Sequence, residues 1–460
     1  MKKPILTAAV LLSVFAITAC SSGGGSQTFS EAHDAFETKL LKQESDQSEV
    51  PQPPAGVFDL SYYDSKIGPM AAYVSSDPGD GQKHPLMIWV AGGWSNDIGD
   101  FPWSYAEWEN DQSAAAFREA GILMMYPSFR GANGNPGSYE SLFGEVDDLI
   151  SACEYAMSLP YVDSDRIYLG GHSTGGTLVL LASEYADNFR AVFSFGPADN
   201  FRSYTGTEFA FDKGNNNEYK LRSPINWLSD IKSPTFIIEG KDGNVSCLQN
   251  IDKKSDNENI NCYIVDGAGH FSVLAPVNRL LAQKVAADTG AEVNITLTGE
   301  ELQEAMRQTP VVSYPVMVPY RNEVIGFTMQ MPAIWEEHDN SGEYIQYSYY
   351  SAYGDDNFWD SLLLYVDVYD LDSELLYEEF IDSINYDGNL YQGSKVEISG
   401  QTVYLAKGIV TDSSGDPFFN RIAAFQTADQ FVEFWFYVPE KHQDLADIII
   451  IDVIESIILE

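Results

Sequence analysis

The most constraining feature of this 460-residue chain is a glycine-rich turn that follows an apolar run. Beyond Arg166–Leu169 the sequence continues with Gly171, His172, Ser173, Thr174, Gly175 and Gly176. Glycines permit a tight turn that a Cβ would obstruct, and a helix N-terminus beyond the turn favours developing negative charge. The pattern predicts a strand, a sharp turn and a helix, with Ser173 presented at the end of the strand as a nucleophile. A Gly/Ser turn without chemistry is the alternative interpretation.

A serine hydroxyl needs a neighbouring base, which histidine usually supplies. Of the six histidines, His270 fits best, because it follows the apolar run Cys262–Val265 and lies in the glycine-containing loop Gly267–Phe271. That context predicts a loop at the C-terminal end of a strand, where Ser173 is also expected. The histidines that do not suit this role are His33, His84, His172, His338 and His442.

The carboxylate that orients the histidine is expected after the apolar strand Thr235–Ile238. Asp242 is the first choice, since it follows this strand and precedes His270. Glu239, directly after the strand, is one alternative. Asp199, which follows the preceding predicted strand, is the other, although an aspartate there also suits a turn or a helix cap.

Acyl transfer also needs backbone N–H groups aimed at the oxyanion of the transition state. The N–H of Thr174, next to the nucleophile, is the first candidate. Gly92, Gly93 or Trp94 is expected to supply the second, because these residues follow the apolar strand Leu86–Val90. A simple Gly-Gly turn is the competing explanation.

Strand and helix patterns alternate through this region, which predicts a mostly parallel, doubly wound sheet. The helices are expected at Leu142–Ser158, Thr177–Tyr185 and Ala275–Ala287. Active sites in such sheets lie at the C-terminal ends of strands. Ser173, Asp242 and His270 all fall at such ends.

Residues 57 to 290 resemble an α/β-hydrolase of the prolyl-oligopeptidase and dienelactone-hydrolase-like branch. The similarity is carried by Tyr126–Gly131, Gly144–Asp148, Tyr161–Ile167, the Ser173 turn and the Gly269–His270 pair. It implies an α/β-hydrolase fold for residues 56–290 and cleavage of an ester or amide through an acyl-enzyme on Ser173, without a cofactor or a metal.

The sequence departs from this family pattern at two positions. The acid usually comes three residues after the glycine that closes its strand, where this chain has Gly243 rather than Asp242. Ala91 stands where related enzymes often carry the histidine of a His-Gly-Gly sequence. These departures keep open a non-catalytic binding lipoprotein built on a hydrolase scaffold.

The resemblance also bears on the substrate, a small-molecule ester or a peptide. Oligopeptidases of this branch place a β-propeller before the hydrolase domain, and the residues before position 56 are too few for one. We therefore expect an esterase or small-amide hydrolase, with an exopeptidase of the prolyl-oligopeptidase type as an alternative. The segment Phe201–Asp230 lies where this fold inserts a cap. Arg130 is expected to anchor a loop through Glu140 or Glu145 rather than to bind a substrate carboxylate.

The N-terminus resembles a bacterial lipoprotein signal. Lys2 and Lys3 precede the apolar run Ile5–Ile17, and Ile17, Thr18, Ala19 and Cys20 form a lipobox. We expect residues 1–19 to be a signal peptide, Cys20 to be lipidated and residues 20–55 to be a flexible tether. Ser21 fits sorting to the outer membrane, so the expected location is the cell envelope, facing the periplasm or the exterior. Disulfides are permitted there, and Cys247 and Cys262 are expected to pair, with Cys153 a free thiol.

A second domain follows a linker at residues 291–312, which contains a short predicted helix, Glu300–Gln308. Residues 313–460 predict an α+β domain, because β-rich runs recur there and two helical segments, Ser373–Ile384 and His442–Ile458, interrupt and end them. Its opening, Gly326–Trp335, is faintly similar to PsbP and Mog1-like domains. A binding or spacer role with an unidentified partner is the expectation.

The net charge argues against two kinds of partner, nucleic acid and anionic membranes. The chain carries −42, and residues 311–460 hold 27 acidic residues against 5 basic ones. Such a surface repels nucleic acid and anionic membranes. Solubility in a salty habitat explains the charge better than calcium binding at Asp355, Asp356 and Asp360, which lack EF-hand spacing.

Overall fold

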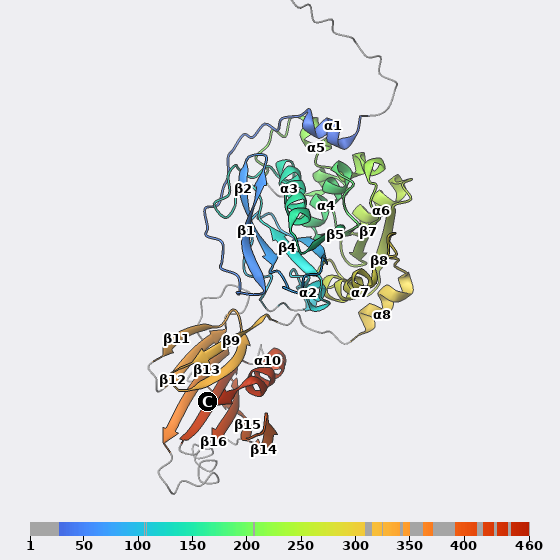
Figure 1. Ribbon diagram of the computed structural model, residues 1–460. Coiled ribbons are helices and arrows are strands. Elements are labelled where there is room, and N and C mark those ends of the chain that lie inside the picture. Colours follow the sequence, from blue (N-terminus) through green and yellow to red (C-terminus); the bar gives the residue numbers. More distant parts are fainter. Residues whose placement is uncertain are drawn as a thin grey trace, which may run out of the picture.

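The computed structural model has two domains (Figure 1). It describes residues 27–459 apart from positions 105, 107, 206–207, 309–314, 324, 341–343, 350–361, 371–391, 412–416, 427–429 and 440–442. The first domain contains an eight-stranded sheet, and the second contains a three-stranded and a seven-stranded sheet. This is the predicted α/β-hydrolase fold followed by a domain with antiparallel sheets.

The eight-stranded sheet is parallel from β4 to β8, with antiparallel β1 and β2 at one edge. In spatial order its strands are β1 (Phe58–Ser65), β2 (Gly68–Ser75), β4 (Leu123–Pro127), β3 (His84–Val90), β5 (Val162–His172), β6 (Ala191–Phe195), β7 (Thr235–Gly240) and β8 (Ile260–Val265). The order reverses around β3 and β5. Ser173 directly follows β5, so it lies at the switch point where such sheets bind ligands.

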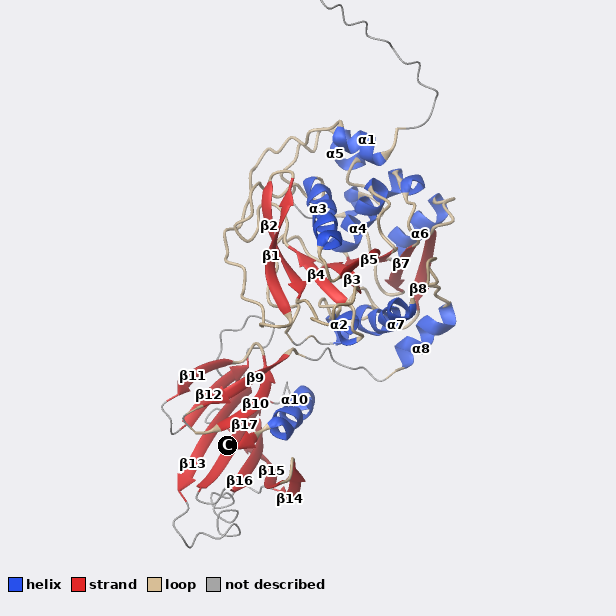
Figure 2. Cartoon of the chain, viewed as in Figure 1, coloured by secondary structure: helices blue, strands red, loops and turns tan. Residues whose placement is uncertain are grey.

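Helices cover both faces of this sheet (Figure 2). Alternate residues of β3 separate the two cores: Ile88 packs with α3 (Gly144–Ser158) and α4 (Thr174–Tyr185), whereas Trp89 packs with α2 (Ala115–Glu119) and α7 (Leu274–Ala287). Side chains of a strand point alternately to opposite faces, so a sheet buried on both sides needs continuous apolar strands. Helix α6 (Val245–Lys254) packs beside β7 and β8.

The turn after β5 depends on close packing of the helix that follows it. A Cβ at Gly175 would lie 2.3 Å from the carbonyl oxygen of Val90 and 2.6 Å from that of Ala91. Glycine therefore lets α4 lie directly against the end of β3. The predicted strand, turn and helix form as expected, with α4 beginning at Thr174 rather than at Thr177.

The N-terminal segment differs from the tether expected for residues 20–55. Among its described residues, α1 (Phe29–Asp34) packs on the hydrolase domain and the Phe29 side chain is fully buried. A capping box in which the Thr28 and Glu31 side chains satisfy each other's backbone N–H groups starts this helix. The polar composition of this segment gave no sign of the Phe29 ring, which is large enough to hold the segment in place by its burial.

The second domain begins after α8 (Gly299–Arg307), which starts with a capping box at Thr298 and Glu301. Its three-stranded sheet has the order β18 (Ile458–Leu459), β10 (Phe327–Pro332), β9 (Met317–Asn322). Its seven-stranded antiparallel sheet contains β11 (Glu336–Asn340), β12 (Tyr344–Tyr349), β13 (Leu362–Asp370), β17 (Gln430–Pro439), β16 (Pro417–Gln426), β15 (Gln401–Thr411) and β14 (Gln392–Ile398). Helix α10 (Gln443–Ser456) packs on this sheet and on β10. The N–H of Val316 donates to the carbonyl of Trp103, which joins the two domains.

Several predictions fall outside the described residues: the signal peptide, Cys20, the helix Ser373–Ile384 and the acidic cluster Asp355, Asp356 and Asp360. Within the described part of the chain, no helix has both the length and the apolar character that a membrane span requires.

The predicted disulfide is wrong in this structure. Cys247 and Cys262 are both free thiols, as is Cys153. Cys247 lies on α6 close to Asp199, whereas Cys262 packs beneath the apolar side chains between α6 and the sheet. Burial raises the pKa of the Cys262 thiol to about 12. Closeness in sequence suggested the pairing, but α6 directs the two side chains to different surroundings.

The contact between α4 and β3 predicts that Gly175→Ala destabilises the first domain. The added methyl group meets backbone oxygens that cannot rotate away, so we expect the free energy of unfolding to fall by about 1–3 kcal/mol or more. Urea unfolding followed by circular dichroism measures this. Gly99→Ala is the matched control, because a Cβ there has no atom within 4 Å. Equal stability of the two variants would contradict the close packing.

Candidate active site

Ser173 has the strained backbone of a nucleophile turn. Its φ is 55° and its ψ is −113°, a conformation that non-glycine residues seldom adopt. The turn is held from both sides: the N–H of Ser173 donates to Phe195 O at 2.7 Å, and its carbonyl accepts from the N–H of Thr177 at 2.9 Å. The side chain is partly exposed. Neighbouring elements therefore fix an unfavourable conformation that presents the hydroxyl at the end of β5.

His270 lies against a buried carboxylate at the end of β7. Its Nδ1 is 3.0 Å from Oε2 of Glu239, whose side chain is fully buried. The Glu239 oxygens also accept the N–H of Gly240 at 2.7 Å and that of Asn244 at 2.8 Å. A carboxylate surrounded by donors accepts the Nδ1 hydrogen of the imidazole. The Nε2 of His270 is then left with a free lone pair, as a general base requires.

The first choice of acid, Asp242, is not the partner of His270. The Asp242 side chain is exposed, and its backbone N–H donates to Ala268 O at 3.1 Å. Asp199 is buried but accepts from Ser203 and Asn250 instead. Glu239, the alternative next to the strand, makes the contact. We expected the acid in the loop after β7, but Glu239, in the last residues of β7, already reaches His270.

Gly196 lies beside both the nucleophile turn and His270. It follows Phe195, whose carbonyl holds the N–H of Ser173, and its φ is +54°. A Cβ at Gly196 would lie 2.5 Å from Cε1 of His270 and 2.7 Å from Oε2 of Glu239. One peptide therefore contacts the nucleophile turn with its carbonyl and the base and acid with its Cα. The sequence signal for this residue, a glycine directly after a buried strand, was not used in the prediction.

The oxyanion candidates lie where the N-terminus of α4 meets the turn after β3. Thr174 is buried, and its hydroxyl donates to the carbonyl of Gly93. Of the three candidates in the turn, Gly92 already donates its N–H to Oε1 of Gln112 at 2.9 Å. Because the Gly92 N–H is already used, the N–H of Gly93 or that of Trp94 remains as the second oxyanion donor.

His172 connects the base loop to the turn after β3, although it was set aside as a base. Its Nε2 lies 3.0 Å from His270 O, a carbonyl that can only accept, so Nε2 carries the hydrogen. Its Nδ1 then accepts from Nε2 of Gln112 at 3.0 Å. Burial and, secondarily, the His270 charge lower the pKa of His172 to about 3. A ring that stays neutral keeps this chain of hydrogen bonds intact over the working pH range.

Arg130 is a loop anchor, as expected. Its guanidinium donates two hydrogen bonds of 2.9 Å to Asp148 and one of 2.6 Å to Glu140. Glu140 was among the predicted partners, and Asp148 was not. Because Arg130 is almost fully buried, it is not available to bind a substrate carboxylate.

The expected cap, Phe201–Asp230, contains α5 (Asn216–Lys220), and its short helical turns at residues 224–230 pack against α4 and α6. Arg222 fastens it: its guanidinium is fully buried and donates to Glu218 and Thr38 and to the carbonyl of Glu140. The Arg222 guanidinium thus links the cap to the N-terminal segment and to the turn before α3.

Aromatic side chains form a wall beside the oxyanion turn. The ring of Trp94 lies 4.7 Å from that of Tyr204 and 5.2 Å from that of Phe209, and Trp94 keeps 37% of its surface exposed. The Tyr204 hydroxyl contacts Thr177 in the first turn of α4 at 2.7 Å. This wall joins the cap to the nucleophile helix and presents apolar surface to a bound substrate.

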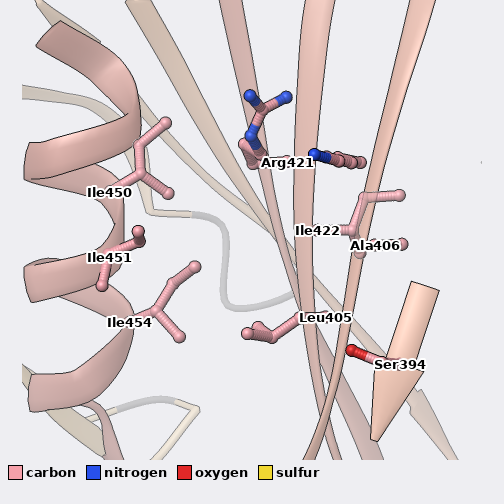
Figure 3. Close-up of a pocket in the computed structure, with 9 residues that line it drawn as sticks. Ser394, Leu405, Ala406, Arg421, Ile422, Ile450, Ile451 and Ile454 are labelled. Carbon is pink, nitrogen blue, oxygen red and sulfur yellow. The ribbon is translucent and has the colours of Figure 1, made fainter. Parts of the chain in front are cut away.

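A separate cavity of about 310 Å³ lies in the second domain, between α10 and strands β14 to β16 (Figure 3). Three isoleucines of α10 face Leu405 and Ile422 across it, and Ser394 lies at its rim. The described residues that line the cavity include Lys407 and Arg421 but no histidine or carboxylate, so Ser394 has no counterpart there of the His270–Glu239 pair. The candidate active site is therefore the one in the first domain.

Comparison with known proteins supports this assignment. Residues 107–284 match the model of the prolyl oligopeptidase family. An uncharacterized peptidase of Bacillus subtilis is 28% identical over 147 residues, which cover 28% of this chain and 56% of that protein. The chain thus spans about half the length of this curated relative.

Solved structures with similar folds come from several organisms. A puromycin-hydrolyzing peptidase of Mycobacterium tuberculosis has a TM-score of 0.41 and 19% identity, covering 52% of this chain and 41% of that one. An esterase of Pyrobaculum calidifontis has a TM-score of 0.39 and 16% identity, covering 51% and 87%. Residues 107–284, which lie in the first domain, are thus similar in sequence to the prolyl oligopeptidase family.

Proposed function

We propose that this protein is a serine hydrolase that cleaves an ester or a small amide through an acyl-enzyme on Ser173. The observation that carries the proposal is the 3.0 Å contact between His270 Nδ1 and the buried Glu239, placed next to the strained nucleophile turn by the Phe195–Gly196 peptide. Perturbed backbone and a buried acid beside a histidine are characteristic of catalytic sites.

In the first step, the Ser173 oxygen attacks the carbonyl carbon of the substrate while Nε2 of His270 takes the hydroxyl proton. Glu239 accepts the Nδ1 hydrogen and stabilises the imidazolium that forms. The carbonyl oxygen gains negative charge, which the N–H of Thr174 and that of Gly93 or Trp94 stabilise.

The His270 imidazolium then gives its proton to the leaving alcohol or amine, which departs and leaves the acyl group on Ser173. A water molecule attacks the acyl carbon, with His270 again as the base, and the carboxylic acid product is released. Every proton moves through the single side chain of His270, and no cofactor enters any step.

An exopeptidase is the second candidate, and the match to the prolyl oligopeptidase family favours it. Ester and amide substrates differ in the leaving group, because an amine must be protonated before it can depart. Turnover of p-nitrophenyl butyrate compared with that of aminoacyl p-nitroanilides separates the two candidates. Faster cleavage of the anilides would select the peptidase.

A fluorophosphonate probe tests catalysis itself, because it reacts with serines activated by a base. We expect the wild-type protein to be labelled and Ser173→Ala to lose the label completely. Ser158→Ala, which removes an exposed hydroxyl at the end of α3, is the control and should label normally. Absence of labelling in the folded wild-type protein would instead support a binding protein on a hydrolase scaffold.

Substitution of the three candidate acids tests the role of Glu239. Glu239→Gln should lower kcat on p-nitrophenyl acetate by about 10²–10⁴-fold, because an amide N–H favours the imidazole tautomer that has no free lone pair on Nε2. Asp242→Asn should remain within about twofold of wild type, since that side chain is exposed. Asp199→Asn, which alters bonds to Ser203 and Asn250, should mainly affect stability. Loss of turnover in Asp242→Asn alone would reject Glu239 as the acid.

We also propose that Cys20 carries a lipid that anchors the chain in the cell envelope, at the outer membrane. The support is the lipobox Ile17–Cys20 with the basic and apolar residues before it. Metabolic labelling with an alkyne fatty acid should mark the wild-type protein in the membrane fraction. Cys20→Ser should lose the label and leave that fraction, whereas Cys153→Ser should keep both. Retention of the label in Cys20→Ser would disprove the anchor.

A further inference from the structure

Three metal-binding side chains meet where the N-terminal segment packs on the first domain. His33 and Asp34 end α1, and Asp147 lies in the first turn of α3. Their ligand atoms lie within 4.8 Å of one another. His33 Nδ1 is 3.8 Å from Oδ1 of Asp34 and 3.9 Å from Oδ1 of Asp147.

The nitrogen that faces the two carboxylates is buried and unsatisfied. The His33 side chain is only 2% exposed, and its Nδ1 has no hydrogen-bond partner among the residues that the structure describes. Its Nε2 lies 3.1 Å from Phe143 O. Because a carbonyl can only accept, the hydrogen is on Nε2, and Nδ1 directs a lone pair toward two further electron donors. A histidine whose second nitrogen donates to a backbone carbonyl is the usual form of a metal ligand.

The surrounding rings hold this imidazole in place. It stacks on Phe143 at 4.3 Å and meets Tyr185 edge-on at 5.4 Å. The Tyr185 hydroxyl donates to Oδ1 of Asp34 at 2.9 Å, which orients that carboxylate as well. Two of the three donors are therefore oriented before any ion arrives.

A cation already lies beside these donors. The Lys66 ammonium is 2.8 Å from Oδ1 of Asp147 and 3.6 Å from Oδ1 of Asp34. Its side chain is 56% exposed, so it can swing into solvent without losing buried contacts. The cluster therefore attracts positive charge, yet the Lys66 ammonium leaves the His33 Nδ1 lone pair unused.

We infer that His33, Asp34 and Asp147 form a site for a divalent transition-metal ion of the Zn²⁺ class, which displaces Lys66. Imidazole with two carboxylates suits Zn²⁺ better than Ca²⁺ or Mg²⁺, which prefer oxygen alone. Ligands about 2.1 Å from one ion are roughly 3.4–4.2 Å apart, depending on geometry. The separations from His33 Nδ1 fall inside that range, and water completes the coordination.

The ion would join two elements far apart in sequence, α1 and α3, which Figure 1 shows at the same end of the first domain. Its role is to hold the N-terminal segment on the hydrolase domain. It takes no part in the chemistry at Ser173, so the site can exist whether or not the proposed hydrolysis is correct.

Zn²⁺ titration of the metal-free full-length Cys20→Ser chain against a chromogenic chelator tests the site. We expect one tight Zn²⁺ site in this parent chain. Relative to the parent, His33→Phe and Asp147→Asn should each bind Zn²⁺ at least about tenfold more weakly. Lys66→Met, which removes the competing charge, should bind Zn²⁺ about tenfold more tightly or better. Phenylalanine at position 33 keeps the ring stacking, and the asparagine keeps the shape of the aspartate. Circular dichroism without metal shows that each variant folds.

The control is Glu37→Gln, which removes an exposed carboxylate three residues beyond the site. It should bind Zn²⁺ as the parent chain does, which separates the site from general attraction to a chain of charge −42. Equal affinities of Glu37→Gln and His33→Phe would overturn the proposal. So would the absence of tight binding in both the parent chain and Lys66→Met, because the three donors would then hold no ion even without the competing ammonium.

Discussion

The buried carboxylate of Glu239 is the group on which the site depends. A charge removed from water is tolerable only when every lone pair that loses solvent finds a donor. Here two backbone N–H groups and the His270 imidazole supply those donors. Because the acid belongs to a central strand and not to a flexible loop, the orientation of the base is set by the sheet itself.

The sequence predicted the turns that carry Ser173 and His270 because their signals are local. A strand followed by a glycine turn needs no tertiary information, and α4 and β5 formed where the pattern placed them. The acid was misassigned since both Glu239 and Asp242 follow the same strand. What separates them is burial, which depends on how the 267–271 loop packs over β7, and nothing in the residue spacing records that packing.

The N-terminal segment shows a second limit of local patterns. Residues 27–55 are polar, and composition of that kind is typical of linkers. One side chain, Phe29, nevertheless enters the core beside Trp227, and Thr38 bonds to the cap. Phe36 also packs against Phe143, so a few aromatic contacts hold the segment on the first domain while they change its average composition little. The same packing brings together His33 and Asp147, whose proximity cannot be seen in the sequence.

The guanidinium of Arg222 has a consequence for how substrates reach Ser173. It ties the cap to the turn before α3 and to the N-terminal segment at once, so the cap cannot lift as an independent lid without abandoning a desolvated charge. On the proposed function, substrate would therefore reach Ser173 without the cap lifting as a whole, and turnover would not be limited by a slow opening motion of that kind.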